Sequence, residues 1–256
     1  MISVQNNLRQ LFTLLVTLFV IFSVFIFQPS SFAQSVDDSL EKQVLLIIRE
    51  HPEAIKEALQ MQKQKEYQKY QKKLKEFAEE AKNHPSEVIG TSPTTGSIEG
   101  KILLIEFSDF QCPYCAQASS VLKQFLSKHQ QEVTLIYKHF PITSIHSEAM
   151  PAAKAAWAAE QQGKFWEYHE ALFKQQKRLN EGLYRNIAKS LGLNIEKFDK
   201  DRLGEAANSA IQQDIDMVNQ LGINSTPFFI MGSENFAGVL SLDDMEQLLS
   251  KLVPKA

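Results

Sequence analysis

The residues of this 256-residue chain best suited to chemistry are its two cysteines, which lie in the segment Cys112-Pro113-Tyr114-Cys115. Two thiols separated by two residues on the first turn of a helix can close a disulfide with little backbone movement, and can open it again. Pro113 suits the first helical position, where its missing N–H is not needed. Cys112 would then lie at a helix N-terminus, where the helix dipole lowers a thiol pKa. We therefore expect Cys112 to be the nucleophile and Cys115 the resolving thiol.

Two other interpretations of the pair are a structural disulfide and half of a metal site. A zinc site normally needs two further ligands of suitable spacing, and the chain has no second C-x-x-C and no nearby histidine pair. His139, His146 and His169 have no convincing ligand spacing on one helix face, and His169 lies between aromatic residues typical of a packed core. We expect a redox pair with no metal ion and no cofactor.

The N-terminal segment is predicted to direct export. Residues 11–27 are apolar and uncharged, Arg9 precedes them, and small residues before and at Ala33 fit a cleavage site. We expect residues 1–33 to be a signal peptide; an uncleaved anchor through residues 11–27 is the alternative. Either outcome places the chain outside the cytoplasm, in a bacterial periplasm or cell envelope, where disulfides form and persist.

Residues 36–83 form a predicted helical extension rich in Lys, Gln and Glu. The dipeptide His51-Pro52 should separate two helices, because proline disfavours a helical conformation in the residue before it. Apolar residues recur at steps of three and four from Leu40 to Phe77. The extension is either a solvated arm or an oligomerisation element, and we favour a homo-oligomer formed through residues 36–82.

The rest of the chain reads as an α/β unit interrupted by helices. We expect a strand over 101–107, a helix over 113–129 and a second strand over 133–138. A helical insertion over about 143–210 follows, and then a β-hairpin around 223–239 and a terminal helix to Leu252. Residues 91–97 have loop chemistry, and Val88–Ile89 are assigned to a short edge strand. The predicted class is α/β.

Four separated segments of the chain resemble the DsbA-like thiol–disulfide oxidoreductases of the thioredoxin superfamily. The similarity lies in the active-site strand and helix start, the next strand end, part of the helical block and the loop before the hairpin. These segments are residues 105–115, 137–141, 155–173 and 223–229. The resemblance covers residues 86–256 and implies a thioredoxin fold with an inserted all-helical subdomain. Residues 46–55 also resemble the helical N-terminal extensions of ScsC-like members, which oligomerise.

The resemblance implies roles for five further residues. Thr226 and Pro227 would form a cis peptide bond beside the cysteines and leave backbone groups free to bind an extended client; an ordinary trans proline is the alternative. Glu106 matches the buried acid of the family, which can relay a proton to or from Cys115; the alternative is a partly exposed carboxylate at a strand end. Tyr114 stands where the strongest oxidants have histidine. Together with Pro113 it should tune the redox poise, and we expect a milder oxidant.

The predicted function is that of an exported oxidoreductase that oxidises client dithiols through a mixed disulfide at Cys112. An oligomeric isomerase or reductase is one alternative, and a copper-handling or chaperone-like binding protein is another. Partners would be proteins with free thiols or disulfides and a membrane or soluble redox partner. The net charge of −3 argues against a nucleic-acid partner.

Overall fold

The computed structural model of the protein describes residues 38–97 and 102–253. The predicted signal peptide lies outside these residues. In the described part of the chain, no helix combines the length and the apolar character that crossing a membrane requires. The chain divides into two compact units, residues 1–63 and residues 64–256, which are described separately.

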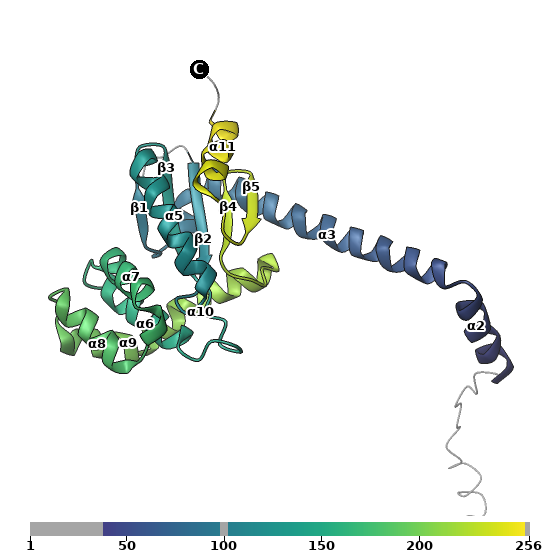
Figure 1. The fold of residues 1–256 in the computed structure, drawn as a ribbon, viewed down its shortest axis with the longest axis horizontal. Helices are drawn as coiled ribbons and strands as arrows, with labels where there is room; N and C mark the ends of the chain where they lie inside the picture. The colour runs from purple at the N-terminus through teal and green to yellow at the C-terminus, as the bar shows by residue number, and fades with distance from the viewer. Residues whose placement is uncertain (1–37, 98–101, 254–256) are drawn as a thin grey trace, which may run out of the picture. The chain divides into compact units, whose positions relative to one another are not determined.

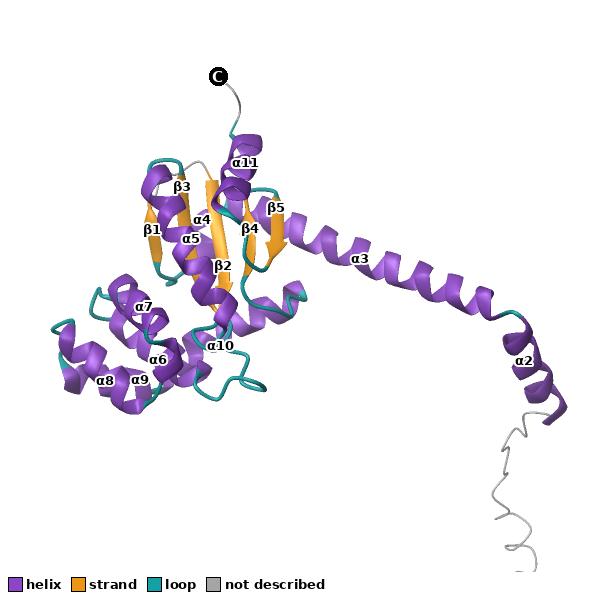
Figure 2. Cartoon of the chain, in the orientation of Figure 1, coloured by secondary structure: helices purple, strands orange, loops and turns teal. Residues whose placement is uncertain are grey.

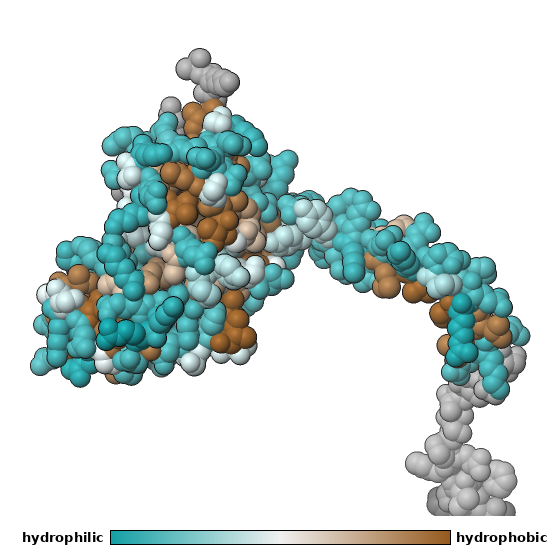
Figure 3. All heavy atoms as spheres, in the orientation of Figure 1, coloured by the Kyte–Doolittle hydropathy of each residue, from teal (hydrophilic) through white to brown (hydrophobic). Residues whose placement is uncertain are grey.

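The described part of the first unit consists of α2 (Asp38–Glu50) and the beginning of α3 (Pro52–Asn83). The predicted separation of two helices at His51-Pro52 is confirmed. Many apolar side chains in this unit are exposed, among them Ile47 and Leu59. In Figure 3 they stand out as brown residues along α2 and the first turns of α3. An apolar helix surface of this kind normally requires a partner surface.

A mixed five-stranded sheet forms the centre of the second unit (Figure 2). Its spatial order is β1-β3-β2-β4-β5. The strands are β1 (Thr94–Gly96), β2 (Ile102–Ser108), β3 (Val133–His139), β4 (Phe228–Met231) and β5 (Glu234–Ala237). β2 and β3 are parallel, and the other pairs are antiparallel. Glu106 lies in the central strand β2, opposite Tyr137 on one side and Phe229 on the other.

The two faces of the sheet are covered by different helices because side chains alternate along each strand. Leu104 packs in a cluster with α5 (Pro113–His129) and α11 (Leu242–Leu252), which lie on the same face in Figure 1. Ile105 and Phe107 pack on the opposite face against α10 (Glu205–Leu221) and the last turns of α3. In those turns Leu74, a core residue, is almost completely buried. Glu106 therefore points toward the α5 face of the sheet.

The helical insertion comprises the elements between β3 and β4, residues 149–221. They are α6 (Ala149–Glu160), α7 (Phe165–Lys174), the short 3-10 helix η1 (Gln176–Arg178), α8 (Glu181–Ser190), α9 (Ile195–Leu203) and α10. Seven buried alanines in α6 allow its neighbours to approach closely. α10 returns to the sheet, where Asp214 accepts a hydrogen bond of 2.8 Å from the His139 N–H and lies 3.5 Å from the Lys138 ammonium. The α/β class and the helical insertion are confirmed.

The edge strand of the sheet differs from its prediction. Val88–Ile89 belong to the short helix α4 (Pro85–Ile89), because Pro85 starts a helical turn directly after α3. The edge strand is Thr94–Gly96, in a segment predicted to be a loop. It pairs with β3, with Thr95 opposite Leu135. Gly96 adopts a φ of 97°, and a Cβ atom there would meet the Val133 carbonyl.

Candidate active site

Cys112 is the N-cap residue of α5, and Pro113 occupies the first turn, as predicted. The Cys112 backbone is extended, with φ −71° and ψ 121°, so the chain turns into the helix immediately after it. Both cysteines are free thiols, and both are buried. Tyr114, between them, is 59% exposed.

The surroundings of the Cys112 thiol favour its ionised form. Its pKa falls to about 5, chiefly because the Cys115 thiol can donate a hydrogen bond to the thiolate. Burial acts in the opposite direction and raises the pKa, while the Thr226 hydroxyl and the N–H groups of Tyr114 and Cys115 lower it further. The Thr226 hydroxyl has no hydrogen-bond partner within the described residues, so it is available to the thiolate.

Cys115 has the opposite tendency. It is completely buried, and burial raises the pKa of its thiol far above the usual range. The neighbouring Cys112 raises it further, while the Asp109 N–H lies 3.5 Å from the Cys115 sulfur. At neutral pH the pair therefore holds one thiolate, on Cys112, and one thiol, on Cys115.

Thr226 and Pro227 lie directly opposite Cys112 and are joined by a cis peptide bond, as predicted. The Cys112 sulfur is 3.4 Å from the Thr226 carbonyl oxygen. The Thr226 N–H forms no hydrogen bond within the part of the chain that is described. A free backbone donor beside the nucleophile is what an extended client chain would pair with.

Glu106 lies under α5, and the exposed strand-end alternative is excluded. The residue is fully buried, and neither carboxyl oxygen has a hydrogen-bond partner among the described residues. Burial raises the pKa of Glu106 to about 7. The Ser108 hydroxyl lowers the pKa of both Glu106 and Cys115, which places it close to both groups.

A cavity of about 300 Å³ lies beside Glu106. Glu106 and the buried His169 line it, together with the exposed Lys123 and Ser127 of α5. The His169 ring packs against aromatic residues, with Phe173 4.8 Å away between ring centroids. Burial lowers the pKa of both His139 and His169 to about 3, so both rings are neutral at physiological pH. His146 lies apart from them and contacts Asp109.

Three residues of the site were missed by sequence reasoning. Ser108 follows Glu106 on the same face of β2, a spacing that could have identified it. Asp109 and Gln176 hold the backbone just before α5: Asp109 Oδ1 accepts a hydrogen bond from the Gln111 N–H, and the Gln176 amide donates to the Cys112 carbonyl. Nothing local in the sequence marks Gln176, which lies 64 residues beyond its partner.

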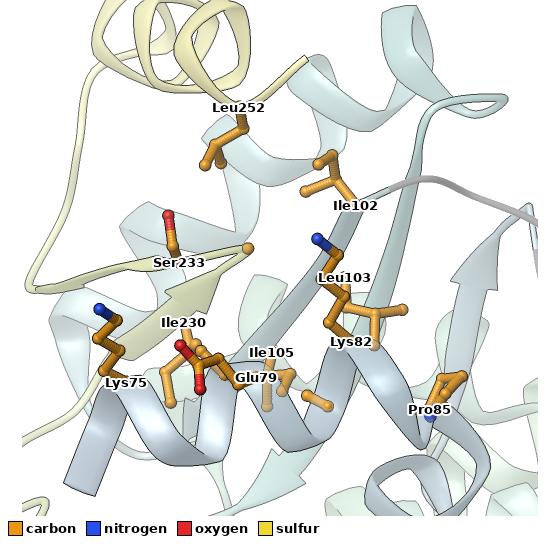
Figure 4. Close-up of a pocket in the computed structure, with 13 residues that line it drawn as sticks. Lys75, Glu79, Lys82, Pro85, Ile102, Leu103, Ile105, Ile230, Ser233 and Leu252 are labelled. Atoms are coloured by element: carbon orange, nitrogen blue, oxygen red, sulfur yellow. The ribbon is translucent and has the colours of Figure 1, made fainter. Parts of the chain in front are cut away.

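A second cavity, of about 380 Å³, lies away from the cysteines (Figure 4). Ile102 lines it at the start of β2. The active-site loop, residues 109–112, follows the other end of that strand. Leu103, Ile105 and Ile230 form apolar walls, and the figure shows the charged ends of Lys75 and Lys82 beside them. It has no cysteine in its lining and is not part of this site.

Together the fold and the cysteine pair define a thioredoxin-like protein with the DsbA-type fold of thiol–disulfide exchange. Residues 88–251 match the sequence model of the family described as Thioredoxin, which covers more than half of the chain. The chain belongs to this family.

Known proteins similar to this chain include a solved thioredoxin-like oxidoreductase from Silicibacter pomeroyi DSS-3. It is 29% identical with a TM-score of 0.59, over 63% of this chain and 92% of that one. ScsC from Proteus mirabilis, in a transitional conformation, shares the fold at 21% identity and a TM-score of 0.58, over 86% of this chain and 97% of that one.

A curated relative, the Na(+)/H(+) antiporter NhaA 3 of Salinispora tropica, is 30% identical over 148 residues. The aligned residues are 58% of this chain and 22% of the relative. The chain thus spans about a fifth of the length of that protein. The name of that protein refers to the whole of the longer molecule.

The buried acid leads to a prediction about stability. Because the pKa of Glu106 is about 7 in the folded protein and about 4.5 ordinarily, ionisation opposes folding. The penalty is absent below pH 4.5, grows as the pH rises to 7 and is complete above it. We expect Glu106→Gln to gain about 3 kcal/mol of unfolding free energy relative to wild type between pH 4 and pH 8.

Urea denaturation at each pH measures this gain. The matched control is Glu234→Gln, at an exposed carboxyl in β5. If the difference in unfolding free energy between Glu106→Gln and wild type were constant across this pH range, Glu106 would not be a buried group that titrates near neutrality.

Proposed function

We propose that this protein is an exported thiol–disulfide oxidoreductase that oxidises client dithiols through a Cys112–Cys115 disulfide. The observation that carries the proposal is the opposite shift of the two cysteine pKa values, to about 5 for Cys112 and upward for Cys115. A stabilised thiolate favours the reduced form of the pair, and a pair that favours its reduced form is an oxidant.

In the proposed reaction, a client thiolate attacks the Cys112 sulfur of the enzyme disulfide, and Cys115 leaves. The client is then held to Cys112 by a mixed disulfide. A second client thiolate attacks the client sulfur of that bond, which closes the client disulfide and releases Cys112 as a thiolate. The client loses two protons in total: one is matched by the proton that Cys115 gains, and one remains in solvent. The client is oxidised, and the enzyme leaves reduced.

Glu106 is the proposed acid for the first step. Because the pKa of Cys115 is strongly raised, Cys115 is a poor leaving group unless it is protonated as it departs. A carboxyl with a pKa of about 7 is half protonated at neutral pH, and Ser108 lies close to both groups. The cavity that Glu106 lines would then return the proton from solvent.

Tyr114 supports a moderate oxidant. Its side chain is exposed, and as a neutral phenol it adds no positive charge near the Cys112 thiolate. The stabilisation comes instead from the hydrogen bonds of Cys115, Thr226 and the helix N-terminus. The apolar N-terminal segment supports an extracytoplasmic location, where a membrane or soluble partner would reoxidise the pair.

An oligomeric isomerase is the second candidate, favoured by the exposed apolar side chains of α2 and early α3. Self-association through residues 36–82 would cover these side chains. Several copies of the cysteine pair in one assembly could hold a misfolded client while its disulfides exchange.

The roles of the two cysteines are tested with single substitutions. We expect Cys112→Ser to abolish oxidation of a reduced client, because no sulfur remains to form the mixed disulfide. With a client that already contains a disulfide, Cys115→Ser should accumulate the mixed disulfide on Cys112, visible by mass spectrometry of the intact protein. The Cys112 thiolate attacks the client disulfide and one client sulfur leaves as a thiolate, and no Cys115 thiol remains to release the client. Activity of Cys112→Ser equal to wild type would remove Cys112 from the mechanism.

Proton transfer by Glu106 is tested by the pH profile of client oxidation. Below about pH 6 we expect Glu106→Gln to be about 100-fold slower than wild type, the lower end of what a positioned general acid contributes. The two rates should converge as the pH rises above 7, because wild-type Glu106 is then ionised. A rate ratio that is constant with pH would contradict the role.

Self-association is tested by placing charge on the exposed apolar helix surface. We expect the double variant Ile47→Lys, Leu59→Lys to be monomeric by light scattering where wild type is an oligomer, and to lose activity on a scrambled disulfide protein. Oxidation of a simple dithiol peptide should be unchanged. Gln60→Lys, at an exposed polar position of α3 next to Leu59, is the control. A monomeric wild type would contradict the isomerase candidate.

A further inference from the structure

The loop that carries the nucleophile is held largely from outside the sheet. Asp109 Oδ2 accepts a hydrogen bond of 2.9 Å from the Ile142 N–H and lies 2.7 Å from His146 Nδ1. Gln111 Oε1 accepts a bond of 2.7 Å from the Glu148 N–H. These three donors all belong to the loop, residues 140–148, that leads from β3 into the helical insertion. The active-site loop is thus fixed at its beginning by this connection.

Gln176, within the helical insertion, holds the end of the active-site loop. Its Nε2 atom donates to the Phe110 carbonyl oxygen and to the Cys112 carbonyl oxygen, both at 2.8 Å. Both partners can only accept, so the side chain must present its NH₂ group to them, and both of its hydrogens are used. Gln176 is therefore the contact from the insertion that reaches the nucleophile's own peptide group.

The orientation of the Cys112 carbonyl affects the thiolate through the backbone. The ψ angle of Cys112, 121°, sets the direction of the carbonyl and of the chain that carries the following N–H groups. Those N–H groups, of Tyr114 and Cys115, stabilise the Cys112 thiolate. The carbonyl oxygen also carries a partial negative charge close to the sulfur, and a hydrogen-bond donor on it reduces its repulsion of the thiolate. The Cys112 carbonyl oxygen also accepts hydrogen bonds from the Cys115 N–H, at 3.1 Å, and from the Ala116 N–H, at 3.3 Å. The Gln176 amide adds a third and shorter hydrogen bond, from outside the helix.

We propose that Gln176 is a positioning residue for Cys112, through which the helical insertion sets the stability of the nucleophile's thiolate. The inference rests on the proposed function, because it concerns the same cysteine. It also gives the insertion a part in the chemistry beyond covering the sheet. A client that displaced η1 would change the reactivity of Cys112 directly.

The test uses the full-length reduced protein and Gln176→Met, which keeps the side-chain length and removes the donor. The thiolate of Cys112 is titrated by its ultraviolet absorbance, and the equilibrium of the cysteine pair with glutathione is measured in parallel. We expect the pKa of Cys112 to rise by about 0.5 to 1, a threefold to tenfold loss of thiolate stability, as for the loss of one hydrogen bond. The equilibrium should shift by the same factor toward a weaker oxidant.

Gln175→Met is the matched control, because Gln175 is the preceding residue and its side chain forms no hydrogen bond among the described residues. Gln176→Glu is a second variant, which retains the shape of the side chain and places a carboxylate against two carbonyl oxygens. In this variant we expect the pKa of Cys112 to rise more than it does in Gln176→Met. If both Gln176 variants titrate like wild type and Gln175→Met, the proposal is overturned. The titration needs no client, so a wild type without exchange activity would refute the proposed function and leave this result standing.

Discussion

The chemistry of the site depends on one interaction, that of the Cys115 thiol with the Cys112 sulfur, which is the largest cause of the lowered pKa of Cys112. It requires two unlike surroundings three residues apart at the start of one helix. Cys112 must lie at the N-terminus of α5, where N–H groups are free, and Cys115 must lie in the core, where ionisation is costly. Closing the disulfide removes this interaction and the thiolate that takes part in it. The geometry of the reduced pair therefore contributes to the free energy of the redox reaction before any client is bound.

The polar groups beneath the cysteines are unusual for a protein core. Glu106, Ser108, Tyr137 and His139 have buried polar atoms with no partner among the described residues. Buried polar atoms are normally hydrogen-bonded, and exceptions gather where function requires them. Here they extend from the Cys115 side of β2 across to β3. Aromatic packing surrounds them: the Phe110 and Tyr137 rings stack with centroids 5.4 Å apart. The rings surround the polar groups without offering them hydrogen-bond partners, and burial in these surroundings raises the pKa of Glu106 to about 7.

The sequence allowed correct prediction of the features that neighbouring residues determine, such as the starts of helices. Pro113 and Pro52 each begin a helix, and both predictions hold because proline restricts the conformation of its own residue and of the one before it. The cis bond at Pro227 required the family resemblance, since a local sequence does not distinguish cis from trans. The edge strand was misplaced because Thr94–Gly96 has loop composition, and only its pairing with the distant β3 makes it a strand. Gln176 was missed for the same reason, because its partners are fixed by the packing of the insertion.

Helix α3 has two kinds of surface along one uninterrupted backbone. Its early residues, such as Leu59, are exposed, while Leu74, Ala78 and Ala81 are core residues of the sheet domain. The last turns of α3 therefore belong to the core of the sheet domain. A recombination point within the helix would have to fall before the half-buried Tyr70 to leave the core complete. A truncation that removed the whole of α3 would therefore expose the part of the core that Leu74, Ala78 and Ala81 now cover.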